Sequence, residues 1–101
     1  MDTDFGKLIG FQWDVGNAKK SLTKHRVTTQ EAEEVFADRT IQILDDPVHS
    51  SAESRWKAFG RTASGRFLTV SFTVRGNLVH VISARAMNRK ERRGYEQKTI
   101  Q

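Results

Sequence analysis

The sequence FLTVSFTVRGNLVHVISAR, residues 67–85, predicts the central part of the fold. Every second side chain from 67 to 74 is apolar, and this alternation predicts a strand with one face turned to a core. Gly76 and Asn77 both tolerate positive φ, so they predict a hairpin turn. Residues 78–85 then return as a second strand. The centre of the molecule is therefore expected to be an antiparallel sheet.

Patterns on either side of this hairpin predict the remaining elements. Helical spacing and capping residues indicate helices at about 15–25 (after Asp14), 29–37 (with a Thr28 to Glu31 capping box) and from Asn88 onward. β-prone runs indicate strands at 11–13, 40–44 and 55–61. The expected order is β-α-α-β-β-β-β-α, an α+β fold with helices packed on one face of an antiparallel sheet.

Length and composition limit the class of protein. The 101 residues suffice for one domain, with residues 1–10 as an N-terminal extension. The absence of cysteine excludes a disulfide framework, a thiol nucleophile and a Cys-type zinc site. No apolar run approaches the roughly 18 residues that span a bilayer, and the N-terminus does not resemble a signal peptide. We therefore expect a cytoplasmic protein without a membrane partner.

Charge is distributed unevenly along the chain. Residues 1–50 hold six Lys and Arg against nine Asp and Glu, a net charge of −3, whereas residues 51–101 hold eleven against three, a net charge of +8. Such a basic half suits RNA, DNA or an acidic protein as a partner. A solvated basic surface that only improves solubility would give the same counts, so charge alone leaves both interpretations open.

The most cationic stretch is VISARAMNRKERRGYE, residues 81–96. Arg85 ends the last strand, and its guanidinium is expected at the sheet edge, where it could hold a phosphate with two hydrogen bonds. Four cations follow on the last helix: Arg89, Lys90, Arg92 and Arg93. The alternative for Arg85 is a salt bridge to one of the acidic helices.

The residue types favour phosphodiester chemistry over other reactions. The chain has no Gly-rich phosphate loop and no GxSxG motif, and its three histidines lie in different segments without a metal-ligand pattern, so we expect no metal and no cofactor. RNA can be cleaved by its own 2′-OH if the protein supplies a base, an acid and cations. Side chains suited to these roles are Lys24, His25, His49, Glu53, Arg55, Arg85 and Tyr95.

Most of these residues also have a structural explanation. Lys24 and His25 fall at the end of the first helix, where cations are stabilised by the helix dipole. Tyr95 could pack its ring against the sheet.

The middle of the chain offers similar alternatives. Glu53 and Arg55 lie on the same side of a strand start and could pair with each other. His49 could be an inert loop histidine, and His80, on a face with apolar neighbours, could be half-buried.

Several short motifs occur in an order that we associate with one family. They are FQWD at 11–14, KH at 24–25, EEVFAD at 33–38, DPVHS at 46–50, ESRW at 53–56, and ISAR with RKERRGYE over 82–96. Through this ordered set, which spans about residues 11–97, the chain resembles the BrnT toxins, ribonuclease components of bacterial type II toxin–antitoxin systems.

The resemblance implies a RelE-like fold, metal-independent RNA cleavage that inhibits translation, and a BrnA-like antitoxin with a ribbon-helix-helix DNA-binding portion. It also implies a hetero-oligomer that binds operator DNA through the antitoxin. The residues at matching family positions, expected to be catalytic, are Lys24, His25, Glu53, Arg55, Arg85 and Tyr95, foremost Arg55 and Arg85. The residues expected to bind RNA are Arg75, Arg89, Lys90, Arg92 and Arg93.

The chain departs from the family pattern near the first helix. Arg26 replaces the glycine of a KHG motif, at a point where the backbone is expected to need positive φ. Arg39 replaces a proline, and Asn17 and Ser21 stand where lysine and asparagine are usual. Independently of these departures, a binding arginine and a catalytic arginine look the same in a sequence. A catalytically silent binding module, basic because its antitoxin is acidic or because it assists operator binding, is therefore the alternative hypothesis.

Overall fold

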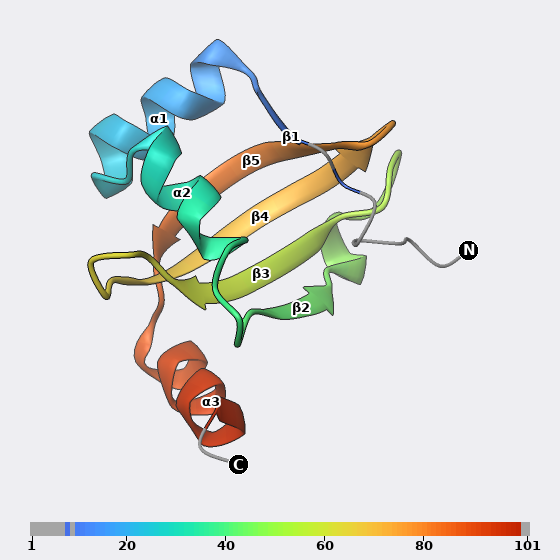
Figure 1. Cartoon of the computed structure of the whole chain (residues 1–101). Coiled ribbons are helices and arrows are strands. Elements are labelled where there is room, and N and C mark those ends of the chain that lie inside the picture. The colour runs from blue at the N-terminus through green and yellow to red at the C-terminus, as the bar shows by residue number, and fades with distance from the viewer. Residues whose placement is uncertain (1–7, 9, 100–101) are drawn as a thin grey trace.

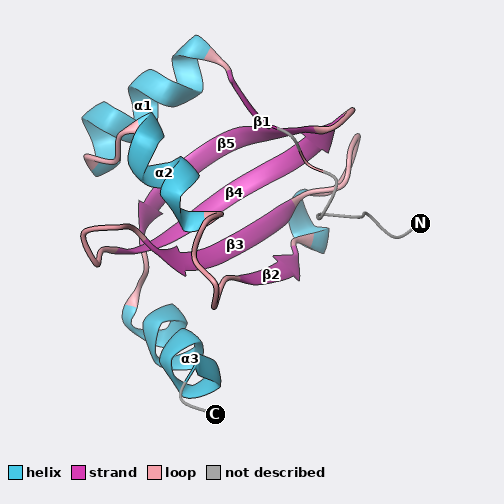
Figure 2. Cartoon of the chain, viewed as in Figure 1, coloured by secondary structure: helices cyan, strands magenta, loops and turns pink. Residues whose placement is uncertain are grey.

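The computed structural model describes Leu8 and residues 10–99, and it confirms the α+β class and the element order (Figures 1 and 2). A short 3₁₀ turn, η2 (Pro47–His49), is an addition to the predicted order. The other elements are β1 (Gly10–Trp13), α1 (Val15–His25), α2 (Thr29–Val35), β2 (Gln42–Asp45), β3 (Trp56–Arg61), β4 (Phe67–Arg75), β5 (Leu78–Ala86) and α3 (Arg89–Thr99). Of the expected extension at 1–10, residues 1–7 and 9 lie outside the described residues, whereas Leu8 packs against the core.

All five strands form one sheet in the order β1-β5-β4-β3-β2. The antiparallel arrangement predicted for the sheet holds from β2 to β5. At the other edge the structure differs, because β1 pairs with β5 in parallel, from Gly10 opposite Leu78 to Trp13 opposite Val81. A strand of four residues carries no sequence signal for the direction of its neighbour, so this pairing could not be predicted from its pattern.

The core lies between the sheet and α2. Phe36 at the end of α2 contacts Phe72 of β4 edge to face, with ring centroids 5.1 Å apart. Gly60 of β3 allows α2 to approach closely, since an added Cβ would lie 2.9 Å from Cγ1 of Val35. The apolar residues that alternate through β4 are thus turned to the core, as the sequence predicted; Leu68, Val70 and Phe72 are fully buried.

Helix α1 contacts the sheet through a polar residue rather than through the apolar residues whose spacing predicted the helix. Ser21 is buried, and its Oγ accepts a hydrogen bond from the backbone N–H of Ala84 at 3.1 Å. Val15 and Leu22 are instead 84% and 51% exposed. The periodicity therefore located the helix correctly, whereas its apolar side is turned largely to solvent.

The predicted helix caps are all present. Asp14 accepts hydrogen bonds from the first turn of α1, and Thr28 with Glu31 forms a capping box at the start of α2. Asn88 and Glu91 form the same reciprocal pair of hydrogen bonds at the start of α3. These local contacts explain why the helix starts could be read from the sequence.

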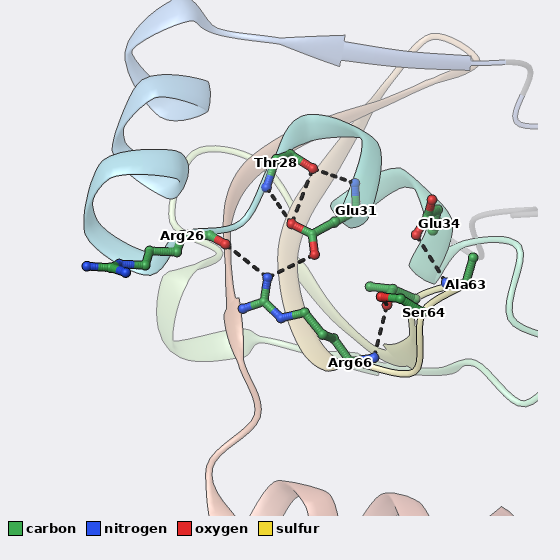
Figure 3. A network of polar contacts seen from close by, with 8 residues as sticks. Arg26, Thr28, Glu31, Glu34, Ala63, Ser64 and Arg66 are labelled. Carbon is green, nitrogen blue, oxygen red and sulfur yellow. Dashed lines mark hydrogen bonds and ion pairs between the residues drawn. The ribbon is translucent and has the colours of Figure 1, made fainter.

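Arg26 ends α1 in the left-handed conformation, with φ of 55° and ψ of 40°, which confirms the expectation of a positive φ at this position. The corner between α1 and α2 is bound to the start of β4 by Arg66 (Figure 3). The Arg66 Nη1 donates to the carbonyl oxygen of Arg26 and to Oε2 of Glu31, both at 2.9 Å. The arginine at the usual glycine position is thus accommodated in a corner held by side-chain contacts.

Helix α3 is the exception to the expectation that helices pack on one face. Its Tyr95 and Glu91 contact Phe67 and Thr69, which alternate with the core residues of β4 and so belong to the opposite face. Figure 1 shows α3 set apart from α1 and α2. Among the described residues, no helix has the length and hydrophobicity needed to cross a membrane.

Candidate functional site

The face of the sheet opposite α1 and α2 is predominantly polar, and we call it the polar face. Strand register defines it through the opposed pairs Lys57 with Ser71, Thr69 with Arg85, Ser71 with Ser83, and Thr73 with His80. Each end of this face is covered by a different segment. The Oγ1 of Thr69 donates to Glu91 of α3 at 3.0 Å, and the Oγ1 of Thr73 donates to the carbonyl of Ser54 in the β2–β3 connection at 2.7 Å.

Arg85 forms a bidentate ion pair at the α3 end of the polar face. Its Nη1 and Nη2 donate to Oε1 and Oε2 of Glu91 at 2.7 and 2.9 Å. Burial raises the Glu91 pKa, but hydrogen bonds from Arg85, the Asn88 N–H and Thr69 outweigh it and lower that pKa to about 2. The structure therefore contains the salt bridge considered as the alternative for Arg85, although the partner belongs to the basic last helix.

Tyr95 joins the same helix to the α2–β2 connection. The Tyr95 hydroxyl donates to Oδ2 of Asp38 at 2.6 Å and lies 2.6 Å from Oγ1 of Thr40. Its ring packs edge to face on Phe67, and the residue is 2% exposed. Burial, followed by the hydrogen bond to Asp38, raises the Tyr95 pKa. The contacts of Tyr95 thus explain how α3 is fixed in place.

The cations of α3 have two different environments. Arg92 lies over the Phe67 ring, 4.0 Å from its centroid, and pairs with Glu96 at 3.6 Å. Arg89, Lys90 and Arg93 are exposed, and none has an ion pair within the described part of the chain. We call these three residues the α3 cationic surface.

A groove of about 360 Å³ separates α3 from β2 and β3. Lys90 and Lys98 lie on its helix side, and Leu44 and Phe59 lie on its sheet side. The groove thus places two cations opposite apolar surface, next to the α3 cationic surface.

Glu53 and Arg75 pair at the hairpin end of the polar face. The Arg75 Nη2 and Nε lie 2.9 and 3.3 Å from the two Glu53 carboxylate oxygens. The hydrogen bond from Arg75 lowers the Glu53 pKa. The structural alternative for Glu53 was a pair with Arg55. Glu53 instead pairs with Arg75 of the hairpin, and its carboxylate thereby neutralises the charge of Arg75.

Arg55 lies just before β3, next to the last register pair of β2 and β3, Asp45 with Trp56. The backbone N–H of Asp46 donates to the Arg55 carbonyl at 2.9 Å, which joins the two residues through their backbones. Among the described residues, nothing forms an ion pair or hydrogen bond with the Arg55 guanidinium.

His49 and Asp46 form a pair that sequence reasoning missed. The His49 Nδ1 lies 2.9 and 3.1 Å from the two carboxylate oxygens of Asp46. The His49 side chain is 58% exposed and that of Asp46 is 9% exposed. The signal was present in the sequence as a carboxylate and a histidine three residues apart around Pro47.

Lys24 and His25 occupy the last turn of α1, beside the left-handed Arg26. Lys24 is exposed and His25 is half-buried. His80 is 8% exposed, with Nδ1 3.2 Å from Oε1 of Gln12, consistent with the expected half-buried role. None of these residues is bonded to another of the expected catalytic residues in the described structure.

The expected catalytic residues therefore do not form one cluster. Arg85 is opposite Thr69, whereas Arg75 and its partner Glu53 lie six positions further along β4, about 20 Å away. Lys24 and His25 lie at a third position, on α1, which covers the face of the sheet opposite the polar face. Within Leu8 and residues 10–99, no three His, Asp or Glu side chains are grouped so that they could hold a metal ion.

Comparisons with known proteins agree with this architecture. Residues 13–91 match the family model described as the ribonuclease toxin BrnT of type II toxin–antitoxin systems. The crystal structure of the Brucella abortus ribonuclease toxin BrnT superimposes with a TM-score of 0.63 at 19% sequence identity, covering 80% of this chain and 99% of that chain. No curated protein sequence matches the chain. The family match spans most of the sequence, so the chain belongs to the BrnT family of ribonuclease toxins of type II toxin–antitoxin systems.

Proposed function

We propose that this protein is a toxin that cleaves RNA as a metal-independent endoribonuclease and thereby inhibits translation in the cytoplasm. The observation that supports this best is the α3 cationic surface, formed by Arg89, Lys90 and Arg93, beside the polar face of the sheet. Cations without carboxylate partners can bind the phosphates of RNA and release its counterions. Arg85 and Arg75 already have carboxylate partners, which favours the helix as the main RNA-binding surface in this proposal.

RNA cleavage without a metal is chemically consistent with the side chains on the polar face. The nucleophile is the 2′-OH of the substrate, so the protein needs only a base, an acid and a cation on the phosphate. Arg55 lies at this face, its guanidinium has no ion pair or hydrogen bond among the described residues, and it is our choice for the phosphate. Arg85 is then a residue that holds α3 in place.

A protein antitoxin is the expected partner within this family. We propose a BrnA-like ribbon-helix-helix antitoxin that forms a hetero-oligomer with the toxin and binds operator DNA. An acidic partner would complement the α3 cationic surface, because opposite charges favour association. RNA and antitoxin would then compete for this helix.

The second candidate function is a catalytically silent binding module in the antitoxin complex. One observation favours it. Two of the residues expected to be catalytic, Arg85 and Tyr95, and one expected to bind RNA, Arg75, are engaged in contacts within the protein. A module of this kind would bind antitoxin or RNA tightly and leave RNA intact.

The deciding experiment incubates the purified protein with a labelled mixed-sequence transcript in EDTA. We expect the wild type to cleave, Arg55→Ala to cleave at least 10-fold more slowly, and Arg39→Ala, which removes an exposed loop arginine, to match the wild type. Arg85→Ala should lower the melting temperature as well as the rate. Intact RNA with the wild type, together with tight antitoxin binding, would instead establish the silent module.

A further inference from the structure

The strongest unassigned feature of the molecule is the contact between Asp46 and His49. Asp46 is 8% exposed, and in the described structure its carboxylate bonds to His49 alone. Although Asp46 precedes the η2 turn, its side chain makes no capping hydrogen bond there. A carboxylate withdrawn from solvent is unfavourable unless it is paired. Its one partner is the imidazole, so holding His49 is its role in this structure.

The pairing determines which nitrogen of His49 is available. A carboxylate accepts hydrogen bonds, so Nδ1 carries the proton when the imidazole is neutral. Nε2 is then the basic nitrogen, on a side chain that is 58% exposed. Neither other histidine combines these features, since His80 is 8% exposed and faces the Gln12 amide, and His25 has no carboxylate partner among the described residues.

Arg55 places a cation beside this pair. The Asp46 N–H donates to the Arg55 carbonyl at 2.9 Å, and the Arg55 N–H donates to the Ser50 hydroxyl at 2.9 Å, which in turn donates to the Asp46 carbonyl at 2.7 Å. These hydrogen bonds hold the turn, shown in Figure 2 beside β2 and β3, against the start of β3. They join the segment that carries the oriented imidazole to the residue whose guanidinium has no ion pair or hydrogen bond among the described residues.

We propose that His49 is the general base of RNA cleavage, that Asp46 is its positioning residue, and that Arg55 binds the scissile phosphate. This inference rests on the proposed ribonuclease function and assigns that function to the β2–β3 connection rather than to Arg85. The substrate class is single-stranded RNA with a free 2′-OH, because the 2′-oxygen must move into line with the P–O5′ bond.

The proposed step is an internal transfer that needs no co-reactant. His49 Nε2 accepts the 2′-OH proton while the 2′-oxygen forms a bond to phosphorus. The P–O5′ bond breaks, and a water molecule gives a proton to the leaving 5′-oxygen. The His49 imidazolium then returns its proton to the resulting hydroxide. The products are a 2′,3′-cyclic phosphate and a 5′-OH end. Arg55 stabilises the charge that develops on the nonbridging phosphate oxygens.

The test compares wild type, His49→Ala, His49→Gln, Asp46→Asn and Arg55→Lys on one labelled transcript under single-turnover conditions. General acid–base catalysis contributes about 10²- to 10⁴-fold, so both His49 variants should lose at least 100-fold in cleavage rate. Asp46→Asn should lower the rate with little effect on RNA affinity, whereas Arg55→Lys should weaken affinity as well. Val48→Ala, an exposed change in the same turn, is the matched control and should cleave normally.

Two further measurements separate a catalytic from a structural role. Added imidazole should restore part of the His49→Ala rate, and the product should carry a 2′,3′-cyclic phosphate. If the wild type cleaves RNA and the cleavage rates of the His49 variants lie within 3-fold of the wild-type rate, the inference about His49 is wrong. The proposed ribonuclease function would then remain supported. Loss of activity that imidazole does not restore, accompanied by lost RNA binding or lost folding, would overturn it as well. Failure of the wild type to cleave would reject the ribonuclease function itself.

Discussion

Replacing Glu91 by Gln should remove a measurable part of the pH dependence of folding stability. The Glu91 pKa is about 2 in the folded protein against 4.5 for an ordinary glutamate. Each pKa unit is worth about 1.4 kcal/mol, so the ionised Glu91 contributes on the order of 3 kcal/mol to the free energy of unfolding near neutral pH. The Glu91 side chain is only 16% exposed, so solvent screens its interactions with Arg85 little.

The sign follows from the direction of the shift. A carboxyl group whose folded-state pKa is depressed stabilises the fold when it is ionised, so its contribution is complete above pH 4.5. As the pH falls from 4.5 to about 2, the unfolded chain binds a proton more readily than the folded protein, and the contribution is lost. Glu91→Gln cannot titrate, so its stability should fall less over this range.

The assay is urea denaturation of wild type and Glu91→Gln at intervals between pH 2 and 7. Glu31, Glu53 and Asp38 also have lowered pKa values, but they remain in both proteins and cancel in the difference. The control is Glu96→Gln on the same helix, where the paired carboxylate is 48% exposed and should change the profile by less than about 1 kcal/mol. Parallel profiles for wild type and Glu91→Gln would refute the assignment of this stability to the Arg85 pair.

Three other substitutions test the fold. Arg26→Gly should raise the free energy of unfolding by about 1 kcal/mol in urea denaturation, because glycine adopts the left-handed conformation without the Cβ penalty; an unchanged or lower value would contradict this. Gly60→Ala should cost about 1–3 kcal/mol by the same assay, since its Cβ would meet Val35 at 2.9 Å; a neutral effect would show that α2 moves freely. Tyr95→Phe should cost about 1–2 kcal/mol in thermal unfolding by removing the hydrogen bond to Asp38, and an unchanged midpoint would show that this bond is dispensable.

Local signals in this sequence predicted local structure well. The alternation through β4, the hairpin turn before β5 and the capping box at Thr28 each depend on residues within a few positions of one another. The positive φ of Arg26 was expected from the glycine that the BrnT pattern has at this position, and not from a local signal in this chain. The parallel pairing of β1 and the position of α3 on the opposite face depend on packing between distant segments, so the local pattern contained no information about them.

The candidate site was harder to predict because ion pairs depend on register. Glu53 and Arg55 were expected to lie on the same side of a strand start and to be able to pair. Glu53 instead pairs with Arg75, which is 22 positions later in the sequence and is brought close by the hairpin. Arg85 pairs with Glu91 because α3, which follows β5 in the chain, packs so that Glu91 lies beside the end of that strand. In contrast, the contact between Asp46 and His49 is local, and a carboxylate and a histidine three residues apart were visible in the sequence.

The backbones of Asp46 and Arg55 are joined by a hydrogen bond from the Asp46 N–H to the Arg55 carbonyl. The Asp46 carboxylate contacts His49, whereas the Arg55 guanidinium has no ion pair or hydrogen bond among the described residues. Removing His49 should therefore remove the base and leave Arg55 able to bind a phosphate. Both residues act in one chemical step, so the effects of His49→Ala and Arg55→Ala on the cleavage rate should overlap rather than add, as expected for residues that act as a unit.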